Sequence, residues 1–151
     1  MRVAVASDHA GFAAKESLRV HLAALGHEVV DLGCGSAESC DYPDFCIPAG
    51  EAVASGRCER GFVLGGSGNG EAIAANKVDG VRAAVVTDDF TAEMARRHND
   101  ANVASFGARV LTEERIRRLA TIFMDTPFDG GRHQRRVEKI AEYERRRGSG
   151  R

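Results

Sequence analysis

Short apolar runs alternate with helical patterns along the chain. Continuous apolar runs predict five strands, at 3–7, 28–32, 61–64, 81–86 and 103–106. Helical patterns between and after them predict helices at 11–25, 43–54, 71–76, 91–98, 113–124 and 134–147. Strands that are apolar along their whole length are typical of a parallel sheet covered by helices on both faces. The pattern therefore predicts an α/β fold built from βαβ units, with the strand order 2-1-3-4-5.

The length of 151 residues is that of one domain. We expect a single domain over residues 1–147, which includes the last helix at 134–147. The glycine- and serine-rich end at 148–151 is expected to be a frayed tail.

The charges nearly cancel, since 21 Lys and Arg stand against 22 Asp and Glu. This balance argues against a nucleic-acid or membrane-surface protein, which needs a basic excess. No apolar run approaches the ~18 residues of a membrane span, and Met1 and Arg2 lead straight into the first strand without a signal peptide. We expect a cytoplasmic protein with no nucleic-acid or membrane partner. Residues 130–151 are nevertheless basic, with 8 Lys and Arg against 3 Glu.

The four cysteines are Cys34, Cys40, Cys46 and Cys58. None forms the C-x-x-C pair of zinc sites and thioredoxin-like motifs. A chain of this size with no export signal does not need a disulfide framework. We interpret all four as reduced thiols, buried or incidental, and expect no metal site.

Two polar loops follow the first and third predicted strands, at 7–11 and 65–71. In doubly wound sheets, ligands bind beyond the carboxyl ends of the strands where the strand order reverses, here between strands one and three. The loop from Gly65 to Gly70 has the glycine spacing of a phosphate-binding P-loop, but Glu71 and Ala72 replace its Lys and Ser/Thr. Its glycines also miss the dinucleotide spacing, so nucleotide binding is a weak interpretation.

Glu71 follows this glycine loop at the start of a predicted helix. Backbone N–H groups at such a helix start form an anion site. Glu71 then has two interpretations: a first-turn carboxylate that compensates the helix dipole, or a general base beside an oxyanion cradle. The second would suit an enediolate reaction, in which a proton leaves one carbon and returns to its neighbour.

Other polar residues also have a structural and a functional interpretation. Asp8 is either a turn cap or part of a site, and His98 is either a helix-end dipole partner or a site residue. Arg132 and Arg136 share a helix face with His133 close by, so they form either a solvated basic face or a phosphate clamp.

The motifs together resemble one known family. They are Ser7-Asp8-His9-Ala10-Gly11, Asp41-Tyr42-Pro43, Gly65-Gly66-Ser67-Gly68-Asn69-Gly70-Glu71, Ala74-Ala75-Asn76-Lys77, His98-Asn99, Phe106-Gly107-Ala108-Arg109 and Gly131-Arg132-His133-Gln134-x-Arg136. In this order and spacing, from Val3 to about Arg147, the chain resembles the type B ribose-5-phosphate isomerases, a family that includes galactose-6-phosphate isomerase subunits.

The resemblance implies a Rossmann-like three-layer α/β/α sandwich and isomerisation of phosphorylated sugars without a metal or cofactor. It also implies a homodimer with the active site at the subunit interface, paired in some members into a tetramer. One branch of the family has a cysteine base at the position of Gly65, and the other has a glutamate base directly after the glycine loop. With Gly65 and Glu71, this chain resembles the glutamate branch.

The same matching implies a role for each motif residue. Glu71 would be the base, while Asp8 and His98 would open the sugar ring. The anion hole would be formed by Ser67 and the backbone of Gly66, Gly68, Asn69 and Gly70. The sugar would be contacted by His9, Tyr42 and Asn99, and the phosphate by Arg109, Arg132, His133 and Arg136.

Our leading hypothesis is an isomerase that interconverts ribose 5-phosphate and ribulose 5-phosphate through an enediolate. One alternative keeps the mechanism but acts on another sugar phosphate, such as allose or galactose 6-phosphate or a tetrulose 4-phosphate. A second alternative is a non-catalytic module that binds a sugar phosphate or a nucleotide.

Overall fold

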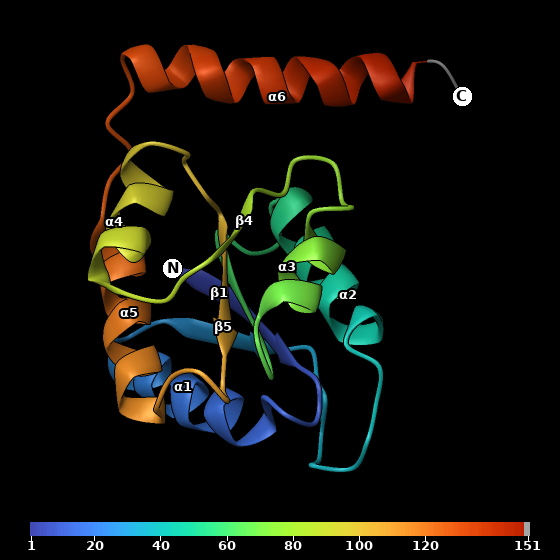
Figure 1. Ribbon diagram of the computed structural model, residues 1–151, viewed down its shortest axis with the longest axis vertical. Helices are drawn as coiled ribbons and strands as arrows, with labels where there is room; N and C mark the ends of the chain where they lie inside the picture. The colour runs from blue at the N-terminus through green and yellow to red at the C-terminus, as the bar shows by residue number, and fades with distance from the viewer. Residues whose placement is uncertain (150–151) are drawn as a thin grey trace.

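The structure is a computed structural model that describes residues 1–149 (Figure 1). The strands are β1 (Arg2–Ser7), β2 (Glu28–Asp31), β3 (Arg60–Gly65), β4 (Ala83–Val85) and β5 (Val103–Gly107). The helices are α1 (Phe12–Ala24), α2 (Pro43–Ala54), α3 (Asn69–Ala75), α4 (Asp89–Arg97), α5 (Glu113–Asp125) and α6 (Arg132–Gly148). Each expected element is present, and α6 extends into the expected tail, whose last two residues lie outside the described part.

The strands of the described chain form one parallel sheet in the order β2-β1-β3-β5-β4. The α/β class and the reversal between β1 and β3 are as predicted, but the predicted order 2-1-3-4-5 is wrong at its end. Every residue of β5 is buried, whereas the three residues of β4 are half-buried. The fully buried strand takes the inner place between β3 and β4, and the short one lies at the edge.

Helices cover both faces of the sheet, which explains the uninterrupted apolar strands. On one face α1, α4 and α5 enclose a core in which the Phe62 ring stacks on Phe106 at 5.8 Å and meets Phe123 edge-on at 5.7 Å. On the other face α2 and α3 pack with smaller residues, mostly alanine, valine and cysteine. The result is the expected three-layer sandwich.

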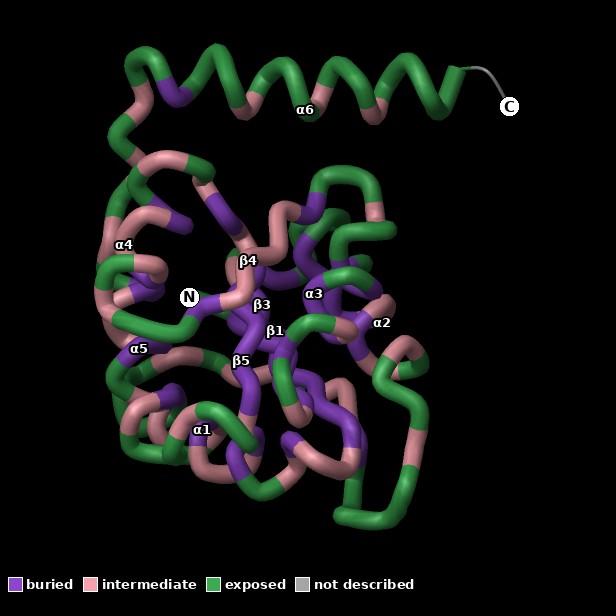
Figure 2. The backbone as a smooth tube through the Cα atoms, viewed as in Figure 1, coloured by how far each residue is buried: buried purple, intermediate pink, exposed green. Residues whose placement is uncertain are grey.

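Helix α6 stands apart from the sandwich (Figure 1). It lies beyond the edge at which the strands begin, and the β5 arrow points away from it. Figure 2 shows it mostly exposed along its length. Its links to the body include a 3.1 Å hydrogen bond from the Gly80 backbone N–H to Glu144 and an ion pair between Arg147 and Asp79. Among residues 1–149, no helix combines the length and the apolar character needed to cross a bilayer.

Candidate active site

A short glycine loop, residues 65–70, joins β3 to α3. Gly68 has φ +83°, a left-handed conformation that glycine adopts without strain. A Cβ atom on Gly68 would lie 3.0 Å from the backbone carbonyl carbon of Phe106, so the loop passes directly over β5. The buried Ser105 hydroxyl donates a 2.6 Å hydrogen bond to the Gly68 carbonyl. Backbone packing and this bond fix the loop to the sheet.

The side chain of Glu71 turns back from α3 over the end of β3. The residue is only 4% exposed. A Cβ atom on Gly65 would overlap Oε1 of Glu71, so the carboxyl group fills the space that any other residue at position 65 would occupy. A carboxylate that merely compensated a helix dipole would remain in water. The burial therefore favours the interpretation of Glu71 as a chemical group of the site.

The surroundings of Glu71 change the acidity of its carboxyl group. Burial raises the pKa of Glu71 above its usual value, and the nearby Asp8 carboxylate adds to the rise. The backbone N–H groups of Glu71 and Gly68 lower this pKa in part. A carboxyl group with a raised pKa is a more effective general base near neutral pH than an ordinary glutamate.

Asp8 lies in the turn between β1 and α1, beside the same edge of the sheet. It is 8% exposed and accepts a 3.1 Å hydrogen bond from the Gly11 N–H, so its expected turn-cap role is present. Its own backbone N–H donates to the Leu64 carbonyl over 3.2 Å, at the end of β3. The turn thus places Asp8 close to Glu71, and the capping interpretation does not exclude a site role.

Two further expected residues, Tyr42 and Arg109, lie against the glycine loop, and Ser67 and His9 have contacts of their own. The Tyr42 ring covers Gly70, where an added Cβ would lie 2.8 Å from Cζ of the ring. The Arg109 side chain lies against Gly66, where an added Cβ would be 3.2 Å from Nη1. His9 approaches the backbone of Cys40 through Nδ1, at 3.3 Å from both its N and its O. Ser67 is exposed and accepts from the Asn69 N–H at 3.2 Å.

The other expected site residues lie at the opposite edge of the sheet. Helix α4 runs back from the end of β4, so its last turn and His98, Asn99 reach the edge where the strands begin. The five residues of β5 separate this edge from the glycine loop by about 16 Å. Arg132, His133 and Arg136 begin α6 on the same side as His98. Within one chain, the expected site therefore falls into two clusters.

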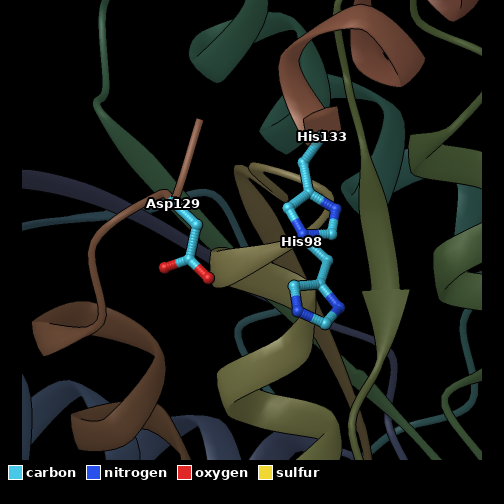
Figure 3. A group of neighbouring side chains, drawn as sticks. All are labelled: His98, Asp129 and His133. Atoms are coloured by element: carbon cyan, nitrogen blue, oxygen red, sulfur yellow. The ribbon is translucent and has the colours of Figure 1, made fainter. Parts of the chain in front are cut away.

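His98 and His133 form the centre of the second cluster (Figure 3). Their rings stack at 4.1 Å with an interplanar angle of 10°. The Asp129 carboxylate lies beside them, with its oxygens 3.2 Å from Nε of Arg97. His133 is 7% exposed, and burial, followed by His98 and the neighbouring arginines, lowers its pKa. Its imidazole is therefore neutral at neutral pH.

This second cluster is better suited to an anion than to a metal ion. His98, Asp129 and His133 offer ligand atoms within 4.8 Å of one another. However, stacked rings keep their lone pairs in parallel planes, which do not converge on one ion. Arg132 and Arg136 lie near enough to His133 for their charges to lower its pKa. Guanidinium groups and imidazoles together are typical of phosphate recognition.

The sequence profile of the Ribose/Galactose Isomerase family matches residues 3–140. The chain belongs to this family. It is 40% identical over 146 residues to ribose-5-phosphate isomerase B of Escherichia coli, covering 97% of this chain and 98% of the relative. It is 44% identical over 147 residues to the Mycobacterium tuberculosis enzyme of that name, covering 96% and 91%. The family expected from the motifs is thus confirmed.

Solved structures of family members show the same architecture. Ribose-5-phosphate isomerase B of Clostridium thermocellum superposes with a TM-score of 0.95 at 44% identity, covering 97% of this chain and 99% of that structure. The Mycoplasma genitalium protein, solved with bound ribulose 5-phosphate, has a TM-score of 0.92 at 38% identity and covers 95% and 96%.

Sequence reasoning missed several supporting residues of this family member. Ser105 looked like part of an ordinary buried strand, although its hydroxyl anchors the glycine loop. Asp129 and Arg97 pair across 32 positions, so their spacing carried no signal. The Asp129 N–H also donates to the Arg97 carbonyl over 3.0 Å, which ties the segment before α6 to α4.

Proposed function

We propose that this protein is an aldose–ketose isomerase that interconverts ribose 5-phosphate and ribulose 5-phosphate. The observation that carries the proposal is the buried Glu71 carboxyl group, held in the space left by Gly65 at a loop of backbone amides. Relatives at 40–45% identity that carry the name ribose-5-phosphate isomerase B support the choice of sugar. Four free cysteines are in keeping with a cytoplasmic location.

In this proposal Glu71 moves one proton between neighbouring carbons. With the sugar ring open, its carboxylate takes the proton from C2 of ribose 5-phosphate and becomes a carboxylic acid. The negative charge moves to the carbonyl oxygen and gives an enediolate, which the amides of residues 66–70 stabilise. The hydroxyl proton on O2 passes to O1, Glu71 returns its proton to C1 as the carbonyl forms at C2, and the product is ribulose 5-phosphate. The neighbouring Asp8 and a histidine would assist the ring opening before this step.

We further propose that two copies of the chain build each site. The two clusters lie about 16 Å apart along β5, which is longer than a five-carbon sugar phosphate. His98, Asn99, Arg132, His133 and Arg136 of one copy would meet Glu71 and Asp8 of the other. Helix α6 supports a homodimer, because its exposed apolar residues Ile140 and Tyr143, 50% and 59% exposed, offer an unpaired face. The arginines would then grip the phosphate, with Arg109 of the copy that supplies Glu71 nearby.

Mixing two inactive variants tests both parts of the proposal. We expect Glu71→Gln and His98→Asn each to lose at least a thousandfold in kcat, because each removes a proton-transfer group. After unfolding together and refolding, half of the dimers are mixed, and each has one intact site. The mixture should regain roughly a quarter of wild-type turnover, as measured with ribose 5-phosphate.

Recovery below one per cent, with dimers present, would reject the shared site. Retained turnover in Glu71→Gln alone would reject the proposed base. A wild-type panel of ribose 5-phosphate, allose 6-phosphate and galactose 6-phosphate should show the highest kcat/KM for the five-carbon sugar. A protein that binds sugar phosphates but turns over none of them would be a binding module instead.

A further inference from the structure

Helix α4 ends in a turn, residues 98–101, that carries the proposed site residues His98 and Asn99. In this turn Asp100 has φ +44°, and it is the one residue other than glycine that has a positive φ in the described part of the chain. Helices often end on a residue in this left-handed conformation, but glycine is the usual choice because a Cβ atom is strained there. The turn therefore holds an aspartate where the backbone alone favours glycine.

The Asp100 carboxylate joins two arginines that come from different elements. Its Oδ1 accepts a 2.9 Å hydrogen bond from Arg96 of α4, which is 3% exposed, and its Oδ2 accepts a 3.1 Å bond from Arg82, which directly precedes β4. The same arginines hold the turn by its backbone. Nε of Arg82 donates to the Asn99 carbonyl over 3.1 Å, and Nη1 of Arg96 donates to the Ala101 carbonyl over 2.5 Å. The carboxylate thus ties together two side chains that bind the turn on either side of Asp100.

The position of His98 depends on this turn. The His98 ring stacks on His133 of α6 at 4.1 Å and 10°, so a small rotation of the end of α4 would separate the rings. Both carboxylate oxygens of Asp100 are bound by arginines, so this group supports the turn and does not transfer protons. We propose that Asp100 is a positioning residue of the isomerase, which through its two arginines fixes the turn that carries His98. The effect on turnover rests on the proposed function, whereas the effect on the place of His98 does not.

Replacement by glycine separates a positioning role of Asp100 from a purely structural one. A purely structural aspartate would only end the helix, and glycine does this with less strain. Asp100→Gly would then be as active as the wild type. A positioning carboxylate is lost in the same variant, although Arg82 and Arg96 keep their backbone partners and the turn can still form. Asp100→Asn keeps the left-handed conformation and one acceptor oxygen, but not the charge.

NMR spectra of the histidine rings report the position of His98 without substrate. A ring proton that lies over the face of a neighbouring aromatic ring resonates upfield, so the stack on His133 marks the His98 signals, which His98→Asn assigns by their loss. We expect Asp100→Gly to move these signals downfield toward those of a free imidazole, and Asp100→Asn to move them less. Asp89→Asn is the matched control, because Asp89 at the other end of α4 also pairs with two arginines and its side chain is 37% exposed, against 35% for Asp100.

Steady-state kinetics with ribose 5-phosphate measure the effect on the site. We expect Asp100→Gly to lower kcat about tenfold, because His98 is displaced, and to change KM by less than about threefold, because the phosphate-binding arginines lie outside the turn. Asp100→Asn should lose about threefold in kcat, and Asp89→Asn should match the wild type. Circular dichroism checks that each variant is folded, and if Asp100→Gly is not, Asp100→Asn carries the same comparison.

Unchanged His98 signals in the folded Asp100 variants would overturn the inference. The same holds for wild-type kcat in an Asp100→Gly enzyme whose signals have moved, because turnover would then not need the support of the carboxylate. A wild-type protein without isomerase turnover would count against the proposed function alone, since the ring signals still report where His98 lies.

Discussion

At the scale of single residues, the key feature is the close packing of the Glu71 carboxyl group against Gly65. The glycine has no side chain, and the glutamate carboxyl group occupies the vacant position. The sequence identified Glu71 as the candidate base and Gly65 as the position of the cysteine base in the other branch, but it did not show that the Glu71 carboxyl group fills the space beside Gly65. The structure shows that the Glu71 carboxyl group needs a glycine at 65, because a side chain there would occupy the same space.

A methyl group at position 65 should displace the Glu71 carboxyl group, the proposed base. We expect Gly65→Ala to lower kcat about a hundredfold, because a shift of the carboxyl group by 1 Å misaligns the proton transfer. The matched control is Gly35→Ala, since a Cβ atom at Gly35 meets nothing within 4 Å. Steady-state kinetics and circular dichroism check both variants, and a Gly65→Ala enzyme with wild-type kcat would contradict this displacement.

The raised pKa of Glu71 should also appear in the stability of the protein. In the pH range above the ordinary value of 4.5 and up to the raised one, the folded protein binds more protons at Glu71 than the unfolded chain does. The free energy of unfolding therefore falls as the pH rises through this range. We expect Glu71→Gln to be more stable than the wild type at about pH 7, with the difference vanishing below about pH 4.5.

Urea unfolding at a series of pH values measures this difference. Glu113→Gln serves as the control, because Glu113 lies in the first turn of α5 but is exposed. The Glu113→Gln variant should not have a higher free energy of unfolding than the wild type at any pH. A Glu71→Gln protein that is less stable than the wild type at neutral pH would show that the carboxylate is not destabilised by burial.

At the scale of elements, the sequence predicted the type of each helix and strand but not the place of the last two strands. The apolar run at 81–86 looked as suitable for the interior as Val103–Gly107. Only the pairing of β5 with β3, from Gly61 with Val103 to Gly65 with Gly107, reveals the inner strand. Long-range pairing decides this order, and local periodicity does not carry that information.

A salt bridge between a buried lysine of α1 and an aspartate of β2 joins these two elements, and the sequence did not single it out. The Lys15 side chain is 1% exposed and donates to both oxygens of Asp31, at 2.7 and 2.8 Å, while the Asp31 side chain is 34% exposed. We expect Asp31→Asn to cost about 3 kcal/mol, because it leaves a buried ammonium group with Glu16 as its remaining partner.

Lys15→Met should cost less than about 1 kcal/mol, since water reaches the remaining carboxylate and the apolar side chain fills the space. Urea unfolding of both variants measures the asymmetry. If both variants lost the same free energy of unfolding, the ion pair itself, rather than the buried position of the cation, would set the stability.

At the scale of the whole molecule, the candidate residues divide between the two edges of the sheet. The sequence identified Asp8 and Glu71 as neighbours, because both follow strands at the point where the order reverses. The sequence did not give the distance from Glu71 to His98 or to the arginines of α6, since that distance depends on the direction of α4 and on the position of α6. The fold therefore explains why every motif is present although one chain does not bring them all together.

The bond from Ser105 to the Gly68 carbonyl has a consequence for inhibitor design. The glycine loop, which is the proposed anion hole, is anchored to the central sheet through a buried hydroxyl, and this bond favours the same loop conformation before a ligand binds. A rigid planar mimic of the enediolate would meet its donors in place and would not have to order a loop. Affinity in such a series should then depend on the shape of the compound, with little contribution from protein rearrangement.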